Sequence, residues 1–469
     1  MKRIPFFLAA ITIFSLLISS GVSCLFDSKA YAISIKEEED LGKEFLRSIK
    51  RQYSLVEEDF SNRFINDLGG YLSKSRDPKH FRLKFYILKH NTLNAFAAPG
   101  GHIFIFSGLI ETFDDIDELA GVITHEIGHV AARHLSQRIE QGKRIGYATL
   151  AGVLAGVLIG GEAAEALITG SMAANLQAQL RYSRTDERQA DQLGFKYMKA
   201  SGFEPQGMIS TLNKLEKGSW YASGQVPAYL LTHPTGPERM ANLDAMISSF
   251  RPGVEKHEEV TRFTEMFPIF KAVVRATCLD SFEAERLFRL DLEKDPEALL
   301  PNFGLGLVYK EGARYEKAVY HFKKALEKDH DNIPVLTHLG EAYRMSGDNR
   351  TAIVFLEKAL RLDNKSDSAR FHLAFAYEKM ENYEKAIPLF ERLALQKGAE
   401  NEVYYHLGLS YGKSGRLPLA HYNFGRYFMK IHSPEKARFH FEKAEALAEG
   451  MPELADKVAK EIRELDKKK

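Results

Sequence analysis

Two histidines four residues apart flank a glutamate in the segment His125-Glu126-Ile127-Gly128-His129. Apolar residues precede this segment at helical spacing, and on a helix the positions i and i+4 lie on one face. The two imidazoles can therefore bind one Zn²⁺ ion side by side, at the ~2.0–2.1 Å that zinc prefers. Glu126 lies beside them and can take a proton from a water molecule on the metal. The segment predicts one zinc ion per chain and hydrolytic chemistry.

A catalytic zinc site needs a third protein ligand and an open fourth position. Two familiar arrangements of that ligand do not fit this chain. Ala132 and Leu135 stand where a metzincin requires glycine and histidine. The stretch in which a thermolysin-type enzyme has its glutamate is also unsuitable, because residues 145–161 contain no acid. The third ligand must therefore come from farther along the chain.

Glu187 and Asp191 supply a second pair of side chains at i and i+4. Glu187 can be the third metal ligand, which leaves a vacant position for water and substrate. Asp191 can accept a hydrogen bond from a ligand imidazole or protonate a leaving amine, although a purely structural role fits it equally well. We predict His125, His129 and Glu187 as metal ligands, and Glu126 and Asp191 as catalytic groups.

His233 and Arg239 stand in the segment T-H-P-T-G-P-E-R at 232–239. Arg239 could hold Asp191 or the substrate backbone, and His233 could stabilise an oxyanion. As a fourth protein ligand, His233 would instead close the site. Our hypothesis is that His233 alternates between these states and inhibits the enzyme at rest; the alternative is a residue that only starts a helix. His134 is expected to point away from the ligand face and to be structural.

The elements that must position these residues are predicted from apolar patterning. Helix is expected from Ile33 to Tyr71 and again from Asp115, and a strand from Phe81 to Leu88. A second strand, at 101–106, could be an edge strand with which an extended peptide pairs through main-chain hydrogen bonds. A core strand is the alternative. These elements form a predicted domain at 33–250, followed by a linker at 251–264.

The C-terminal half repeats every 34 residues, and this period resembles the tetratricopeptide repeat. Small and aromatic residues recur on the first helix of each pair, and Ala and Phe on the second, so that neighbouring pairs must stack to bury their apolar faces. The clearest positions are Tyr309, Tyr343, Tyr377, Tyr411, Ala318, Ala352, Ala386 and Ala420. We predict repeats over 265–434 and an irregular helical cap at 435–469.

The N-terminus has the order of an export signal. A positive start, an apolar run and Ala30-Tyr31-Ala32 predict a signal peptide at 1–32, cleaved after Ala32, and a periplasmic location. Acylation of Cys24 or an uncleaved anchor are the alternatives. Residues 145–161 carry no charge and could form a hairpin arm that touches a membrane, a buried helix or a short span. The 64 basic and 63 acidic residues give no basic excess, which argues against a nucleic-acid partner.

Three motifs carry a family resemblance: N-A-F-A-A-P-G-G at 94–101, H-E-I-G-H at 125–129 and Y-S-R-T-D-E-R-Q-A-D at 182–191. They resemble the zinc metallopeptidases that include the CAAX prenyl proteases. With an export signal before them and repeats behind, the chain is similar to the periplasmic proteases of this group that assist β-barrel assembly.

The resemblance implies a mostly α protein: an α+β zincin-type metallopeptidase domain followed by an all-α tetratricopeptide solenoid. It also implies that unfolded or stalled polypeptides are substrates, and that outer-membrane assembly machinery is a partner of the repeats. The alternative function is a chaperone or adaptor whose protease is rarely active.

Overall fold

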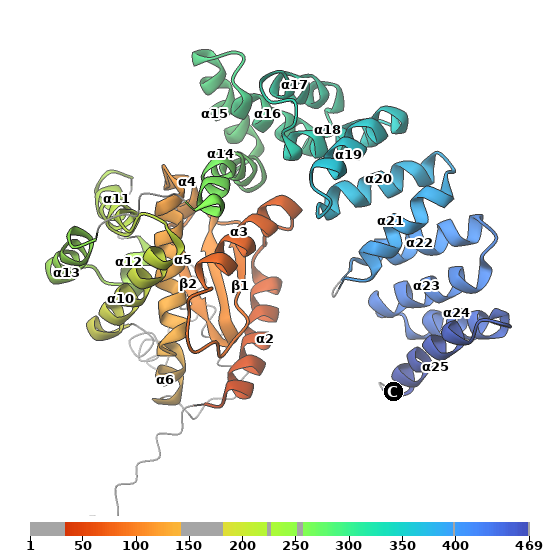
Figure 1. The fold of residues 1–469 in the computed structure, drawn as a ribbon, viewed down its shortest axis with the longest axis horizontal. Helices are drawn as coiled ribbons and strands as arrows, with labels where there is room; N and C mark the ends of the chain where they lie inside the picture. Colours follow the sequence, from red (N-terminus) through yellow and green to blue (C-terminus); the bar gives the residue numbers. More distant parts are fainter. Residues whose placement is uncertain (1–32, 142–181, 223–226, 251–256, 397–398, 468–469) are drawn as a thin grey trace, which may run out of the picture.

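The computed structural model describes residues 33–141, 182–222, 227–250, 257–396 and 399–467. The predicted signal peptide, Cys24 and the apolar segment 145–161 lie outside these ranges. The chain is mostly helical with one small sheet, as predicted (Figure 1). An N-terminal unit at 33–250 contains the sheet, and a helical array follows it. Within the described ranges, no helix combines the length and the apolar character that a membrane span requires.

The elements of the N-terminal unit are α2 (Ile35–Gln52), α3 (Asp59–Leu72), β1 (Lys84–Leu88), β2 (Ala95–Ala98), η1 (Pro99–Gly101), β3 (His102–Phe106), α4 (Ser107–Thr112), α5 (Ile116–Ala131), α6 (His134–Gln141), α10 (Arg184–Ser201), α11 (Gln206–Ala222), α12 (Ala228–Thr232) and α13 (Pro237–Ser248). The elements of the array are α14 (Glu258–Cys278), α15 (Ser281–Lys294), α16 (Leu299–Glu311), α17 (Tyr315–Lys328), α18 (Ile333–Met345), α19 (Asn349–Leu362), α20 (Asp367–Lys379), α21 (Tyr383–Ala394), α22 (Asn401–Lys413), α23 (Leu417–Lys430), α24 (Pro434–Leu447) and α25 (Pro452–Asp466).

The sheet has the strand order β1-β3-β2, so β3 is its central strand. It runs parallel to β1 and antiparallel to β2, and all of its residues are buried. The edge strand that we considered at 101–106 is therefore wrong, and the alternative of a core strand holds. Strand β2 forms the edge of the sheet opposite β1, and it packs against helix α5. Strand β2 was not predicted because four residues are too short for a recognisable alternation of apolar and polar residues.

The first predicted helix, Ile33 to Tyr71, is two helices. The chain leaves helical geometry between α2 and α3 and pairs with the end of β1 there: Leu55 forms a bridge to Leu88, and the amide of Val56 donates to the carbonyl of Ile87 at 2.9 Å. Tertiary pairing outweighs helical propensity in this segment, which a pattern of apolar residues alone does not reveal.

Helix α5 is buried along nearly its whole length. It crosses α10 closely at Gly128, because a β-carbon at this position would lie 2.7 Å from the carbonyl oxygen of Ala190. No side chain fits between the two backbones there, so glycine is required for the approach. This close contact brings the acidic face of α10 against the histidines of α5.

The array consists of stacked antiparallel helix pairs, as the 34-residue period predicts. Gly306 packs against the ring of Phe322, and Gly340 against the side chain of Leu356, each closer than a β-carbon would allow. Helix α14 begins at Glu258, so residues 258–264 of the predicted linker are helical. The predicted cap at 435–469 contains α24 and α25.

The array curves back towards the N-terminal unit (Figure 1). Arg63 at the start of α3 forms an ion pair of 2.8 Å with Asp363, at the end of α19. The backbone amide of Ser368 on α20 donates to the carboxylate of Asp59 at 3.3 Å. These contacts join residues about 300 positions apart in the chain and give the two parts a shared surface.

Candidate metal centre

Three helices, α5, α10 and α12, position the side chains of the candidate site. Asp115 caps α5 by accepting the amide of Glu118, which starts the helix ten residues before His125. Ser183 and Asp186 form a capping box at the start of α10, which places Glu187 in its first turn. His233 is the residue that ends the short helix α12. The site is therefore assembled from one helix interior, one N-terminus and one C-terminus.

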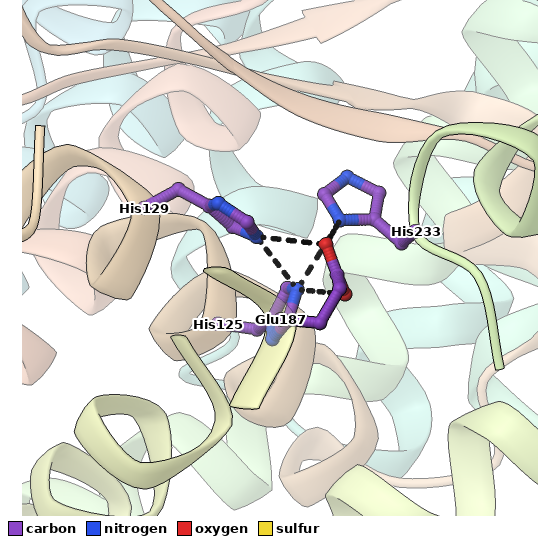
Figure 2. Close-up of side chains that lie close together, drawn as sticks. All are labelled: His125, His129, Glu187 and His233. Atoms are coloured by element: carbon purple, nitrogen blue, oxygen red, sulfur yellow. Dashed lines mark hydrogen bonds and ion pairs between the residues drawn. The ribbon is translucent and has the colours of Figure 1, made fainter. Parts of the chain in front are cut away.

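Four side chains converge in the interior: His125, His129, Glu187 and His233 (Figure 2). The Nε2 atoms of His125 and His129 lie 3.1 Å apart. The Nδ1 atom of His233 is 3.3 Å from Nε2 of His125 and 3.0 Å from Oε1 of Glu187. One ligand atom from each residue lies within 4.8 Å of the other three, and all four residues are at most 2% exposed. Of the predicted residues, the structure thus brings together the three ligands and His233.

The donor set fits a divalent cation. Imidazole nitrogens and one carboxylate are the ligands that Zn²⁺ takes in catalytic sites. Both carboxylate oxygens of Glu126 and Nε2 of His233 are buried without a hydrogen-bond partner among the described residues, whereas Oε2 of Glu187 is paired with Nη1 of Arg239. Unsatisfied buried groups of this kind are costly and rare, so they indicate a site built for an additional partner.

The ionisation of the site is consistent with that partner being a cation. Although burial alone would raise the pKa of Glu187, the neighbouring His233, His125 and His129 hold it well below its ordinary value. Burial lowers the pKa of His129 well below its ordinary value, which leaves its ring neutral. Burial would also lower the pKa of His125, but its hydrogen bonds to Asp191 and Glu187 raise it to about 9. In the metal-free site the Glu187 carboxylate is therefore ionised and the His129 ring is neutral, whereas His125 carries a proton at neutral pH that a metal ion would displace.

Glu126 projects from α5 beside the four converging side chains and is fully buried. Its Oε1 lies 3.4 Å from Nε2 of His233, the ring nitrogen opposite the one that faces Glu187. Burial raises the pKa of the Glu126 carboxyl, which makes it a stronger base than a solvated glutamate. A carboxylate of this kind can accept and return a proton at the site.

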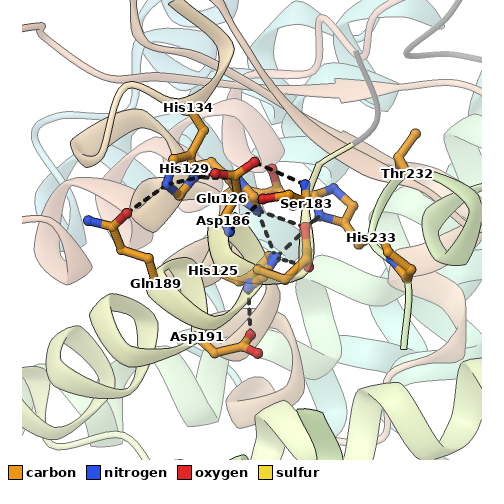
Figure 3. A network of polar contacts seen from close by, with 12 residues as sticks. His125, Glu126, His129, His134, Ser183, Asp186, Gln189, Asp191, Thr232 and His233 are labelled. Atoms are coloured by element: carbon orange, nitrogen blue, oxygen red, sulfur yellow. Dashed lines mark hydrogen bonds and ion pairs between the residues drawn. The ribbon is translucent and has the colours of Figure 1, made fainter. Parts of the chain in front are cut away.

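Asp191 lies on the far side of His125 from the converging ligand atoms. Its Oδ1 is 2.9 Å from Nδ1 of His125, so it can fix the tautomer that leaves Nε2 free to bind a metal (Figure 3). Arg239 contacts Asp191 through Nε and Nη2 at 2.7 and 2.9 Å, and Glu187 through Nη1 at 2.7 Å. Of the two roles considered for Asp191, this geometry favours the orienting one, and Arg239 holds the two carboxylates in place.

His134 occupies a place that the sequence analysis did not anticipate. Its Nδ1 lies 3.0 Å from Nδ1 of His129, and its Nε2 lies 3.0 Å from Oε1 of Gln189 (Figure 3). The prediction that His134 points away from the ligands assumed one continuous helix. Helix α5 ends at Ala131, and Arg133 adopts φ 55°, so α6 starts in a new direction and returns the ring to His129. The pattern of apolar and polar residues around Arg133 does not predict this break between the two helices.

Two aromatic rings also line the site without having been predicted. Tyr182 packs on His129 with ring centroids 3.9 Å apart, and Tyr229 stacks on His233 at 4.6 Å. Both tyrosines are buried. They restrict the orientations of the two histidine rings, and the segment 182–191 is the only sequence signal that pointed towards one of them.

Comparison with known proteins finds a family model and several relatives that this chain resembles. Residues 67–247 match the model of peptidase family M48, and residues 343–407 match a tetratricopeptide repeat model. The beta-barrel assembly-enhancing protease of Escherichia coli strain K12 is 31% identical over 235 residues, which are 50% of this chain and 48% of that protein. The protein of the same name from Yersinia pestis is 28% identical over 62% of this chain and 60% of its own.

The mitochondrial metalloendopeptidase OMA1 of Arabidopsis thaliana is 33% identical over 33% of this chain and 29% of its own length. The chain spans about half the length of the first of these relatives. The matched region at 67–247 contains every residue of the converging site and its surroundings. Residues 67–247 are therefore similar to peptidase family M48, and a match to the tetratricopeptide repeat follows them in the same chain.

Proposed function

We propose that this chain is an exported zinc metalloendopeptidase that cleaves unfolded or misassembled polypeptides of the cell envelope. In this proposal the repeats recruit the substrate or an assembly partner. The periplasm is the proposed location, after cleavage behind Ala32, with a lipid anchor at Cys24 as the alternative. A peripheral membrane contact through 145–161 belongs to the same proposal.

One observation carries the assignment: three side chains of a zinc donor set and a buried glutamate converge in a domain of a metallopeptidase family. His125, His129 and Glu187 would hold the metal. Bound zinc would supply Lewis-acid chemistry, polarising a peptide carbonyl and lowering the pKa of water.

The remaining chemistry belongs to residues of the chain. Glu126 accepts a proton from the attacking water and delivers it to the leaving amine. Asp191 orients His125, and Arg239 neutralises the two buried carboxylates that it contacts. Strand β2 lies at a sheet edge beside α5, which makes it the strand best situated to pair with an extended substrate.

His233 gives the proposal a regulatory element. Its Nδ1 lies among the candidate ligand atoms, and a fourth protein ligand would occupy the position that a substrate requires. We propose that His233 inhibits the enzyme at rest and leaves the ligand set when substrate enters. The His233→Ala variant should then cleave casein faster than the wild-type chain, and unchanged or lost activity would count against this latch.

The test of the peptidase itself is direct. The purified chain should contain one equivalent of zinc, and it should cleave unfolded casein. Glu126→Gln should lower the rate by about 10²–10⁴-fold while it retains the metal. Glu204→Gln, an exposed change on the same domain, serves as the matched control and should have no effect. Purified material without metal, or a Glu126→Gln variant that cleaves casein at the wild-type rate, would refute the proposal.

A chaperone or adaptor role is the second candidate. The observation in its favour is the complete burial of Glu126 and His233, which fits a protease that is closed for most of the time. A cell that lacks the gene and carries the Glu126→Gln variant distinguishes the two candidates. If the variant fully restores the phenotype that the cell shows without the gene, the adaptor role is favoured. If the variant does not restore it, the peptidase is favoured.

A further inference from the structure

A groove of about 730 Å³ lies where the helical array curves back to the N-terminal unit. One wall comes from the residues that start α3 and from the junction of α14 and α15. The other wall comes from the inner helices of the repeats, α16, α18, α20 and α22. The volume is of the size that accommodates a ligand or a few residues of an extended chain.

The lining of this groove is strongly acidic. Its carboxyl groups are Glu57, Glu58, Asp59, Glu311, Glu341, Asp367 and Glu400, and its lysines are Lys89 and Lys310. Lys310 is buried and already paired, at 2.6 Å from Glu341 and 3.3 Å from Glu311. Burial lowers the pKa of His372 in the same wall to about 4, so this ring adds no positive charge at neutral pH. The groove therefore has an excess of negative charge.

Several of these carboxylates are engaged within the protein, whereas two at the rim are not. Glu58 caps α3 by accepting the amides of Phe60 and Ser61. Asp59 accepts the amide of Ser368 and pairs with Arg63 at 3.4 Å, and Asp367 pairs with Arg370, so these two carboxylates add little free negative charge. Glu57 and Glu400 are exposed, and within the described ranges neither has a hydrogen bond or an ion pair. They belong to different walls, one before α3 and one before α22.

Between the acidic positions the groove has apolar side chains from both walls. Phe371 is half-buried in the wall formed by the repeats, and Leu393 and Val403 lie near it. Val56 and Leu279 contribute from the opposite wall. A ligand complementary to this surface presents positive charges together with apolar groups.

We propose that this groove binds an extended cationic polypeptide segment in which apolar side chains alternate with lysine or arginine. The charge of the lining identifies the partner, because complementary charge steers and selects a binding segment. This inference rests on the proposed function in one respect: if the chain is a peptidase, its polypeptide substrate would supply the cationic segment. It assigns to the repeats a recruiting site that they share with the peptidase domain.

The test measures binding without hydrolysis. The full chain carrying Glu126→Gln is titrated into two fluorescent peptides that share an apolar pattern, one with lysine and one with glutamate at the alternate positions. The anisotropy of the lysine peptide should report binding at least tenfold tighter than that of the glutamate peptide, and this binding should weaken with salt. Equal binding of the two peptides would overturn the proposal.

Two double variants locate the site. Glu57→Gln with Glu400→Gln should weaken binding of the lysine peptide roughly two- to fivefold for each charge removed, the range expected for exposed ion pairs. Glu316→Gln with Glu435→Gln makes the same change of net charge on exposed residues outside the groove and should have no effect. An equal loss in both pairs would overturn the proposal. Because this assay measures binding and not cleavage, its result can be interpreted even if the chain proves not to be a peptidase.

Discussion

Arg239 is the residue whose removal should destabilise the candidate site most. Its guanidinium is 9% exposed and contacts both Asp191 and Glu187 at 2.7 Å. In Arg239→Met the volume is largely kept, but Asp191 and Glu187 lose the guanidinium and retain only His125 as a cationic partner. Breaking a buried ion pair by removing one partner costs about 3–5 kcal/mol of stability. We therefore expect a loss of this size in the metal-free protein.

The magnitude follows from two opposing terms. Two unit charges about 4 Å apart interact by about 4 kcal/mol at an effective dielectric constant of 20, so two such pairs contribute about 8 kcal/mol. Removal of the guanidinium also relieves its own desolvation penalty, which is several kcal/mol. The balance is again about 3–5 kcal/mol. For a domain of this size, that corresponds to a fall in melting temperature of roughly 6–20 °C.

The assay is thermal and urea unfolding of the wild-type chain and the variants, first in chelator and then with zinc. The matched control is Asp191→Asn combined with Arg239→Met, which should lose less than the sum of the single changes, because the buried charge and its partner disappear together. Zinc should reduce the loss in Arg239→Met, because a cation at Glu187 replaces part of the missing charge. A loss below about 1 kcal/mol, or additive single changes, would refute this account of Arg239.

Three further predictions test other parts of the structure. His134→Phe removes the acceptor for Nδ1 of His129 and should weaken metal binding by about 10–100-fold, whereas His134→Asn keeps an acceptor and should recover part of it; competition with a chelator measures both. Burial lowers the pKa of His102 to about 4 from an ordinary value of 6.5, so the unfolded chain takes up the proton first as the pH falls. The wild-type chain should therefore lose about 3 kcal/mol between pH 6.5 and 4 through this residue, and urea titrations of His102→Gln should show a smaller loss; equal pH profiles would contradict the assignment. Arg63→Ala removes the ion pair with Asp363, in which the side chains are 30% and 25% exposed, and a contact of 3.4 Å with Asp59. The loss of the exposed pair with Asp363 should cost at most about 1 kcal/mol and increase the radius of gyration measured by X-ray scattering. An unchanged radius would show that other contacts hold the array against the N-terminal unit.

The parts of the fold that could be predicted are those encoded by local spacing. Helix geometry explains both the spacing of His125 and His129 and the 34-residue period. That geometry depends only on residues close together in the sequence, so a local pattern is enough to predict it. The same argument singled out Glu187, because its partner Asp191 recurs at i+4. They can be predicted without knowing which helices and strands pack against one another.

The parts that sequence reasoning missed depend on long-range pairing. Strand β2 is too short to carry a pattern, and the break after α2 exists only because Leu55 pairs with Leu88. His134 reaches His129 because one residue, Arg133, adopts a left-handed conformation. Such events are decided by tertiary contacts, and the residue types at these positions allow several outcomes.

The close crossing of α5 and α10 at Gly128 distinguishes two groups of residues in the candidate site: His125, His129 and Glu187 on these helices, and His233 on a separate segment. Helices α5 and α10 approach backbone to backbone there, which holds Glu187 on α10 close to His125 and His129 on α5. His233 stands outside these two helices, at the end of the five-residue helix α12 and directly before a proline. The centre is therefore expected to open through the segment that carries His233, because the other three side chains stand on two closely packed helices.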